Sequence, residues 1–147
     1  ELKAHGTKRD NVFKTSRYFF FDTGVRNASA NLPLEKGLLT LQMGTLLEHF
    51  VILNILAHFQ GVYDCSYLRT KQGHEIDLIL DTGKKKFAIE IKATKKPALK
   101  DFRGLEYFAQ EYKVDHTLLV CQIGNKQRFG QHLALSWKEI LDYLKAG

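Results

Sequence analysis

The sequence predicts an α/β sandwich with a mixed sheet, and three observations support this fold class. A long segment with helical periodicity is followed closely by three strand-like runs, and a second helical segment then precedes a further apolar strand. The chain has 147 residues, of which 44% are hydrophobic and 26% charged, as is usual for one globular domain with a real core. This order of elements predicts one domain built in layers.

The first part of the chain combines a polar start with one long helix. Residues 1 to 17 are polar and basic without firm periodicity, so we expect a tail of an upstream segment or a linker, followed by the domain at 18–147. The aromatic run YFFFD (18–22) predicts a short buried strand, and NASANLPLEKG (27–37) predicts a loop or a loose helical turn. Residues 38–59 have the pattern of a helix, although glycines weaken its first half.

Three strand candidates follow, at residues 62–70, 75–81 and 86–93. Their connections, KQGH and TGKK, have the length of hairpin turns and contain glycine, so the three strands predict an antiparallel meander. Pro97 then precedes a helix over residues 98–112, whose apolar residues recur at helical spacing.

The last part of the chain returns to the sheet. HTLLVCQI (116–123) predicts a fully buried strand, and HLALS predicts a short one after a turn rich in Gly, Asn and Lys. Ser136 and Glu139 have the spacing of a capping box, which predicts that the last helix, WKEILDYLKAG, opens there. The expected core is therefore α-β-β-β-α-β with a C-terminal strand and helix.

The composition limits which kinds of site and partner we expect for this chain. Cys65 and Cys121 stand far apart in apolar surroundings, which favours free thiols in a reducing cytoplasm, and the histidines show no zinc-ligand spacing. The longest apolar run, residues 51–59, is far too short to span a membrane, so no membrane partner is expected. The net charge of +6 favours an acidic partner, and nucleic acid is the commonest one.

Charged residues interrupt two of the predicted strands. Alternation places Glu75, Asp77 and Ile79 on one face of the strand predicted at 75–81. It places Glu90 and Lys92 on one face of the strand predicted at 86–93. If these strands pair, Asp77 and Glu90 converge, and their mutual repulsion favours a divalent cation between them. Oxygen-rich sites of this kind suit Mg²⁺ or Mn²⁺.

A third acid, Glu48, lies on the apolar stripe of the helix over 38–59. Burying it without a partner is unfavourable, so we expect it to join the same patch as a ligand or a water holder if this helix packs on the strand face that carries Asp77 and Glu90. The alternative interpretation is a solvated sheet face, on which Glu90 and Lys92 form an ion pair and Asp77 is a plain surface residue.

The stretch GHEIDLIL followed by FAIEIKAT resembles the active-site signature of the PD-(D/E)XK nuclease superfamily, which has the restriction-endonuclease-like fold. Together with RYFFFDTGVRN, GTLLEHFVILNIL and YLRTKQGHEIDLIL, it resembles the domain of unknown function that follows the ATPase module in a group of prokaryotic AAA+ ATPases. The resemblance runs from about residue 13 to at least residue 124. One departure is Ile76, where the founding motif has proline.

This resemblance implies a restriction-endonuclease-like three-layer sandwich and a set of site residues. Asp77, Glu90 and the backbone carbonyl of Ile91 would hold Mg²⁺, with Glu48 as a further ligand. Lys92 would orient or deprotonate the attacking water. The implied function is hydrolysis of DNA phosphodiester bonds by a domain attached to an AAA+ ATPase; the chain contains no G-x-x-x-x-G-K-[ST] motif, so we read it as an excised C-terminal domain.

Basic residues flank this set and are candidates for contacts to DNA phosphates, with an exposed strand end and a solvated helix face as the alternative explanation. They are Arg69, Lys95, Lys96, Lys100 and Arg103. Two other functions stay open. One is a catalytically inactive module that binds nucleic acid or protein and regulates the ATPase, and the other is a protein-interaction domain with a decayed site.

Overall fold

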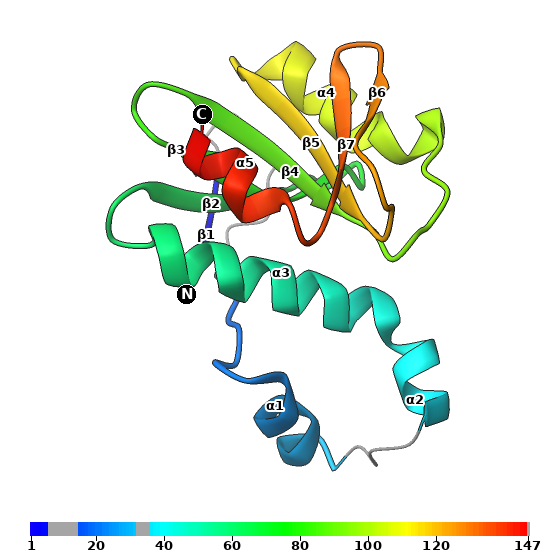
Figure 1. Ribbon diagram of the computed structural model, residues 1–147. Helices are drawn as coiled ribbons and strands as arrows, with labels where there is room; N and C mark the ends of the chain where they lie inside the picture. Colours follow the sequence, from blue (N-terminus) through cyan, green and yellow to red (C-terminus); the bar gives the residue numbers. More distant parts are fainter. Residues whose placement is uncertain (6–14, 32–35, 147) are drawn as a thin grey trace.

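A computed structural model describes residues 1–5, 15–31 and 36–146, and in this part of the chain it shows an α/β fold around one mixed sheet (Figure 1). The strands lie in the order β1-β2-β3-β4-β5-β7-β6. Their bounds are Lys3–Ala4 (β1), Asp64–Arg69 (β2), Glu75–Asp81 (β3), Lys86–Ile91 (β4), His116–Cys121 (β5), Gln127–Phe129 (β6) and His132–Ser136 (β7).

The middle of the sheet is the predicted antiparallel meander of β2, β3 and β4. β4 then pairs in parallel with β5, with Ile89 opposite Leu118, and β5 pairs in parallel with β7. β6 pairs antiparallel with β7 at the sheet edge and was not predicted, because its short polar sequence, QRF, shows no strand pattern.

Helices cover both faces of the sheet (Figure 1). α3 (Met43–Phe59) and α5 (Ile140–Ala146) pack on one face, over a cluster that includes Leu78 and Phe87. The 3₁₀ helix η1 (Leu99–Phe102) and α4 (Arg103–Glu111) pack on the other, over a cluster that includes Ala88. None of the described helices is long and apolar enough to cross a membrane.

The predicted strand at 18–22 is wrong. Tyr18 and Phe21 are 74% and 82% exposed, and the segment joins no sheet. Aromatic residues alone do not make a strand, because a strand also needs an edge that satisfies its backbone hydrogen bonds. Asp22 instead caps a short helix, α1 (Thr23–Ser29), by accepting a hydrogen bond of 3.0 Å from the backbone N–H of Val25.

Two helix boundaries also differ from the prediction. The helix expected over 38–59 is two helices, α2 (Lys36–Leu41) and α3, which separate at Gln42. The last helix begins at Ile140, because only half of the capping box forms: the Glu139 carboxylate accepts from the Ser136 N–H at 3.3 Å, while the Ser136 hydroxyl accepts from Lys138. The segment 27–37, expected to be a loop or a loose helical turn, begins with the end of helix α1 and finishes in the first turn of α2, and its residues 32–35 lie outside the described residues.

A β-bulge in β3 changes which residues share a face. Ser66 pairs with Ile79, but Leu68 pairs with Ile76, so β3 carries one extra residue between the two pairs. Ile76 consequently packs with Ile79 beneath α4, whereas simple alternation had placed it on the same face as Leu78, opposite Ile79. Asp77 lies within this irregular stretch.

The first residues of the chain belong to the sheet edge. Leu2 is fully buried, and β1 pairs in parallel with β2. Leu2 and Arg17 exchange two backbone hydrogen bonds of 2.8 and 3.0 Å, which brings residues 15–17 against the same edge. That an upstream segment continues from here stays a prediction.

Candidate active site

The candidate site lies where β3 begins and β4 ends. Leu78 of β3 is paired with Ile89 of β4, so Asp77 and Glu90 follow as neighbours on adjacent strands. The Asp77 side chain is 10% exposed, and its Oδ2 accepts a hydrogen bond of 2.8 Å from the backbone N–H of Ile91. The meander thus places the two acids of the predicted signature beside each other.

Burial dominates the electrostatics of Asp77. Loss of solvent raises the pKa of its carboxyl to about 7, and the negative charge of Glu48 acts in the same direction. The Ile91 N–H and the Arg17 guanidinium oppose this rise, because both stabilise the carboxylate. Asp77 is therefore a partly compensated buried acid.

Glu90 is less well compensated. Burial, followed by the charge of Asp77, raises the pKa of its carboxyl to about 9, and Lys92 only partly opposes the rise. Its Oε2 is buried and has no hydrogen-bond partner among the residues that the structure describes. Gly104 of α4 lies next to this atom: a Cβ at position 104 would be 3.6 Å from Oε2 and only 2.5 Å from the carbonyl oxygen of Glu75. The glycine thus allows α4 to approach the acids closely.

Lys92 follows β4 and is held between two acids. Its Nζ lies 3.8 Å from Oε1 of Glu90 and 3.7 Å from Oδ1 of Asp101, and it donates a hydrogen bond of 3.3 Å to the Asp101 carbonyl oxygen. Asp101 is itself fixed, because its carboxylate accepts from the N–H of Ala98 at the start of η1. The Lys92 side chain is 36% exposed, so its ammonium group is anchored by the two acids and is still open to solvent.

Glu48 joins the site through a residue that the sequence did not point to. Nη2 of Arg17 donates a hydrogen bond to Oε1 of Glu48, and Nη1 of Arg17 lies 3.8 Å from Oδ1 of Asp77. The helix that carries Glu48, α3, packs on the face formed by Ile89 and Ile91 and not on the face of Ala88, which α4 covers. The expectation that α3 covers the Glu90 face is therefore corrected, and Glu48 reaches Asp77 across Arg17.

The three acids and the lysine of the predicted set thus form one electrostatic network. They are Glu48, Asp77, Glu90 and Lys92. Sequence reasoning missed Arg17 and Asp101. Arg17 could have been noticed as the first residue of the RYFFFDTGVRN stretch, whereas Asp101 stood out only as an acid within a basic run.

A cavity of about 510 Å³ meets the site at Arg17, which lines it together with Arg69 and Glu75. At its rim, Nε of Arg69 lies 2.7 Å from Oε1 of Glu75, so this predicted phosphate contact is already in an ion pair. The cavity is lined by Thr15, Ser16, Arg17, Tyr67, Leu68, Arg69 and Glu75.

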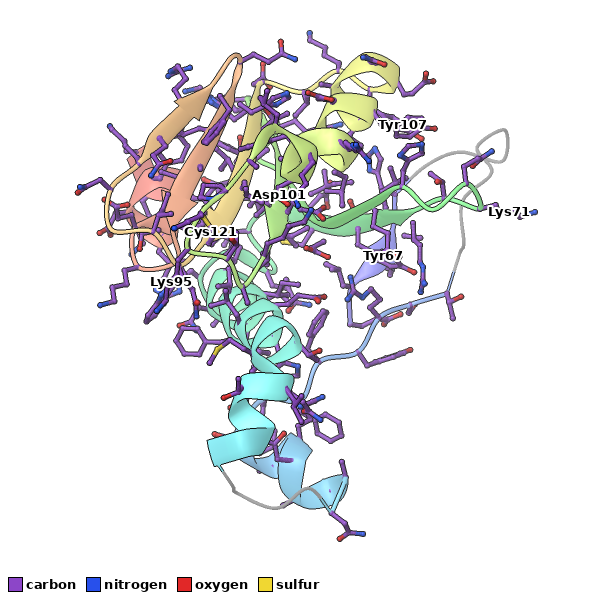
Figure 2. The ribbon with its side chains drawn as sticks, turned by 90° about the vertical axis from the view of Figure 1, so that its right-hand side faces the viewer. Tyr67, Lys71, Lys95, Asp101, Tyr107 and Cys121 are labelled. Atoms are coloured by element: carbon purple, nitrogen blue, oxygen red, sulfur yellow. The ribbon has the colours of Figure 1, made fainter. Side chains whose placement is uncertain are left out.

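The other predicted phosphate contacts are exposed and lie beyond the end of β4 and along η1. Figure 2 shows Lys95 on the segment that leads to Asp101. The same stretch carries Lys96 and Lys100, and Arg103 is the first residue of α4. The lysine side of the site is therefore flanked by positive charge.

Whether these residues fit a metal ion depends on the acid pair. In the described ranges, no three carboxyl, imidazole or thiol groups are arranged to hold an ion together. Two carboxyls and the backbone of Ile91 are adjacent, however, and Glu90 Oε2 is a buried oxygen without a partner. A divalent cation would compensate this oxygen and lower the pKa of both acids, so Asp77, Glu90 and the Ile91 carbonyl fit Mg²⁺ or Mn²⁺.

Comparison with known proteins gave one match. A family model described as a domain of unknown function (DUF4143) matches residues 43–140, which include α3, the whole sheet from β2 to β7 and α4. No curated protein and no solved structure matches the chain.

Proposed function

The chain belongs to the domain family DUF4143, and we propose that it is a magnesium-dependent nuclease-like domain that hydrolyses DNA phosphodiester bonds. One observation carries this proposal: within the described part of the chain, Glu90 Oε2 is buried without a hydrogen-bond partner beside a second buried acid, Asp77. Two adjacent buried carboxyls are unfavourable without a counter-charge. A lysine next to such a pair, Lys92, can orient the water that attacks a phosphodiester.

Each residue has a role in this proposal. Asp77, Glu90 and the Ile91 carbonyl would hold the cation, with Glu48 as a further ligand. A bound Mg²⁺ stabilises the negative charge that grows on the scissile phosphate and on the leaving 3′-oxygen. Lys92, held 3.7 Å from Asp101 and 3.8 Å from Glu90, can donate to a water molecule and orient its lone pair toward phosphorus, or accept its proton.

The proposal also includes the surroundings of the site. Lys95, Lys96, Lys100, Arg103 and Arg69 would contact DNA phosphates, which is supported by their exposure beside the lysine and the cavity. Attachment to an AAA+ ATPase module and a cytoplasmic setting follow only from the resemblance and the thiol pattern. A restriction-endonuclease-like core is supported by the order of helix, three antiparallel strands, helix and parallel strand.

One observation favours an inactive binding module instead. Arg17 already supplies a positive charge to Glu48 and Asp77, and no three acidic groups in the described ranges are arranged around one point. A site that is neutralised in this way can be stable without a metal ion. Such a module would bind nucleic acid or protein and regulate an attached ATPase.

A cleavage assay with linear, single-stranded and branched DNA tests the proposal. We expect Mg²⁺-dependent cleavage that is lost in Glu90→Ala and falls by about a hundredfold or more in Lys92→Ala, since general acid–base groups contribute about 10²–10⁴-fold. Calorimetry should show that Lys92→Ala still binds Mn²⁺, whereas Asp77→Ala and Glu90→Ala do not. Lys84→Ala, in the turn between β3 and β4, is the matched control and should cleave normally.

The outcomes separate the two functions. Undiminished cleavage by Lys92→Ala would remove the role of the lysine in activating water. Equal Mn²⁺ affinity in the wild type and in the acid variants would remove the metal site. Binding of DNA without cleavage by any preparation, with no Mn²⁺ binding, would support the inactive module.

A further inference from the structure

Arg17 occupies a position between two acids of the candidate site. It donates a hydrogen bond from Nη2 to Glu48, while its Nη1 lies 3.8 Å from Asp77 Oδ1. These acids come from different elements, α3 and β3, and Arg17 is the cation that connects them. A divalent cation held by Glu48 and Asp77 would have to occupy the same space.

The charges also indicate competition. Glu48 and Asp77 repel each other, and one guanidinium compensates part of that repulsion. Glu90, which Arg17 does not contact in any ion pair of the described residues, retains a buried oxygen without a partner. A doubly charged ion at Asp77 would supply more positive charge than the single charge of Arg17, which pairs with Glu48 and Asp77.

The side chain of Arg17 has room to leave. It is 35% exposed and lines the 510 Å³ cavity beside Thr15 and Ser16. Its guanidinium lies 5.5 Å from the ring centroid of Phe19 and 5.4 Å from that of Tyr67, contacts that a rotated side chain can keep in part. Rotation into the cavity therefore displaces no residue of the core.

We propose that Arg17 stands in for the divalent cation: it neutralises Glu48 and Asp77 in the metal-free protein and leaves them when the cation binds. This inference rests on the proposed metal site. It makes Arg17 a residue that sets cation affinity, because every binding event must break its ion pairs. It also connects cation binding to the N-terminal edge of the sheet, where the backbone of Arg17 pairs with Leu2.

Titration calorimetry of the full chain with Mn²⁺ tests the competition. We expect Arg17→Gln to bind Mn²⁺ about tenfold more tightly than the wild type, since the charge-assisted hydrogen bond to Glu48 that it removes is worth a factor of about this order. Arg26→Gln is the matched control, because it removes the same charge from a side chain that bonds to the neutral groups of Asn27 and Gln42. Its Mn²⁺ affinity should equal that of the wild type.

Thermal unfolding gives a second measurement that does not depend on activity. Arg17→Gln should melt below the wild type in chelator and approach it at saturating Mn²⁺, because the ion then supplies the missing charge. Arg17→Lys keeps a charge without the forked donor geometry, and should show a smaller gain in Mn²⁺ affinity; it replaces the glutamine variant if that one does not fold.

Two results would overturn the inference, and they differ. If Arg17→Gln binds Mn²⁺ no more tightly than the wild type, or more weakly, then Arg17 supports the acids and does not compete with the ion. If neither the wild type nor any Arg17 variant binds Mn²⁺, the metal site itself is absent and the proposed function fails with it.

Discussion

At the scale of single residues, the two buried acids differ in how their charge is compensated. Asp77 accepts from the Ile91 N–H and lies 3.8 Å from Arg17, whereas the positive charge beside Glu90 is that of Lys92, and Glu90 Oε2 has no hydrogen-bond partner among the described residues. The pKa of Glu90 is accordingly raised further, to about 9, than that of Asp77, to about 7. Glu90 is therefore the group whose state should change most when a cation binds.

These raised pKa values predict how stability depends on pH without metal. The unfolded chain releases the two protons near the ordinary values of 3.8 and 4.5, while the folded chain keeps them up to about 7 and about 9. Between these limits the folded state binds more protons, so the free energy of unfolding falls as pH rises. We expect the metal-free protein to melt higher at pH 5 than at pH 8, by roughly 5 °C or more.

Substitution of Glu90 checks the origin of this effect. Glu90→Gln cannot ionise, so its melting temperature should vary less between pH 5 and pH 8 than that of the wild type and be higher at pH 8. Glu111→Gln, at the exposed end of α4, removes the same charge and should retain the wild-type slope. An identical pH profile for wild type and Glu90→Gln would show that Glu90 is ionised in the fold.

At the scale of elements, the local sequence pattern predicted the structure correctly where a segment's conformation depends on that segment alone. The strand at 75–81 and the meander around it are confirmed, because alternation and glycine turns are local signals. The bulge at Asp77 depends on the pairing of β3 with β2, and the exposed run at 18–22 depends on having no strand edge to join. Neither can be derived from the segment itself, and the role of Arg17 at Glu48 has the same non-local origin.

The close approach of α4 to β3 at Gly104 predicts how a side chain at this position changes the stability of the protein. Gly104→Ala should lower the free energy of unfolding by about 2 kcal/mol, because its Cβ would lie 2.5 Å from the Glu75 carbonyl oxygen. Gly44→Ala in α3 is the matched control: its Cβ meets nothing within 4 Å, so it should raise the free energy of unfolding by about 0.5–1 kcal/mol. Denaturant titration of both variants measures this; equal effects would mean that α4 lies further from the strand.

At the scale of the whole molecule, the site gathers residues that are distant in sequence. Arg17, Glu48, Asp77, Glu90 and Asp101 come from the N-terminal segment, α3, β3, β4 and η1. The acids of the meander could be predicted because their strands are neighbours along the chain. The pairing of Glu48 with Arg17 and of Lys92 with Asp101 could not, because it depends on how the helices close over the sheet.

If the chain binds DNA as proposed, the distribution of positive charge predicts which end of the β3–β4 hairpin makes the contacts. Lys95, Lys96 and Lys100 lie beyond the end of β4 next to Lys92, whereas Lys84 and Lys85 lie in the β3–β4 turn at the other end of the same hairpin. Lys113 is near that turn, because Asp115 donates its N–H to the carbonyl of Lys86. The two groups carry equal charge, so they make a matched pair of triple Lys→Gln variants.

The comparison is made in a Lys92→Ala background with Mg²⁺, where the proposal expects binding with cleavage slowed by about a hundredfold or more. Binding is measured by fluorescence anisotropy of a labelled duplex over a range of salt concentrations. Each lost phosphate contact reduces the slope of log K against log salt by about 0.9. Substitution of Lys95, Lys96 and Lys100 should therefore reduce the slope by about 2 to 3, while substitution of Lys84, Lys85 and Lys113 should leave it nearly unchanged. Equal losses in both variants would mean that DNA is attracted by net charge alone, and that the surface beside Lys92 has no special part in binding.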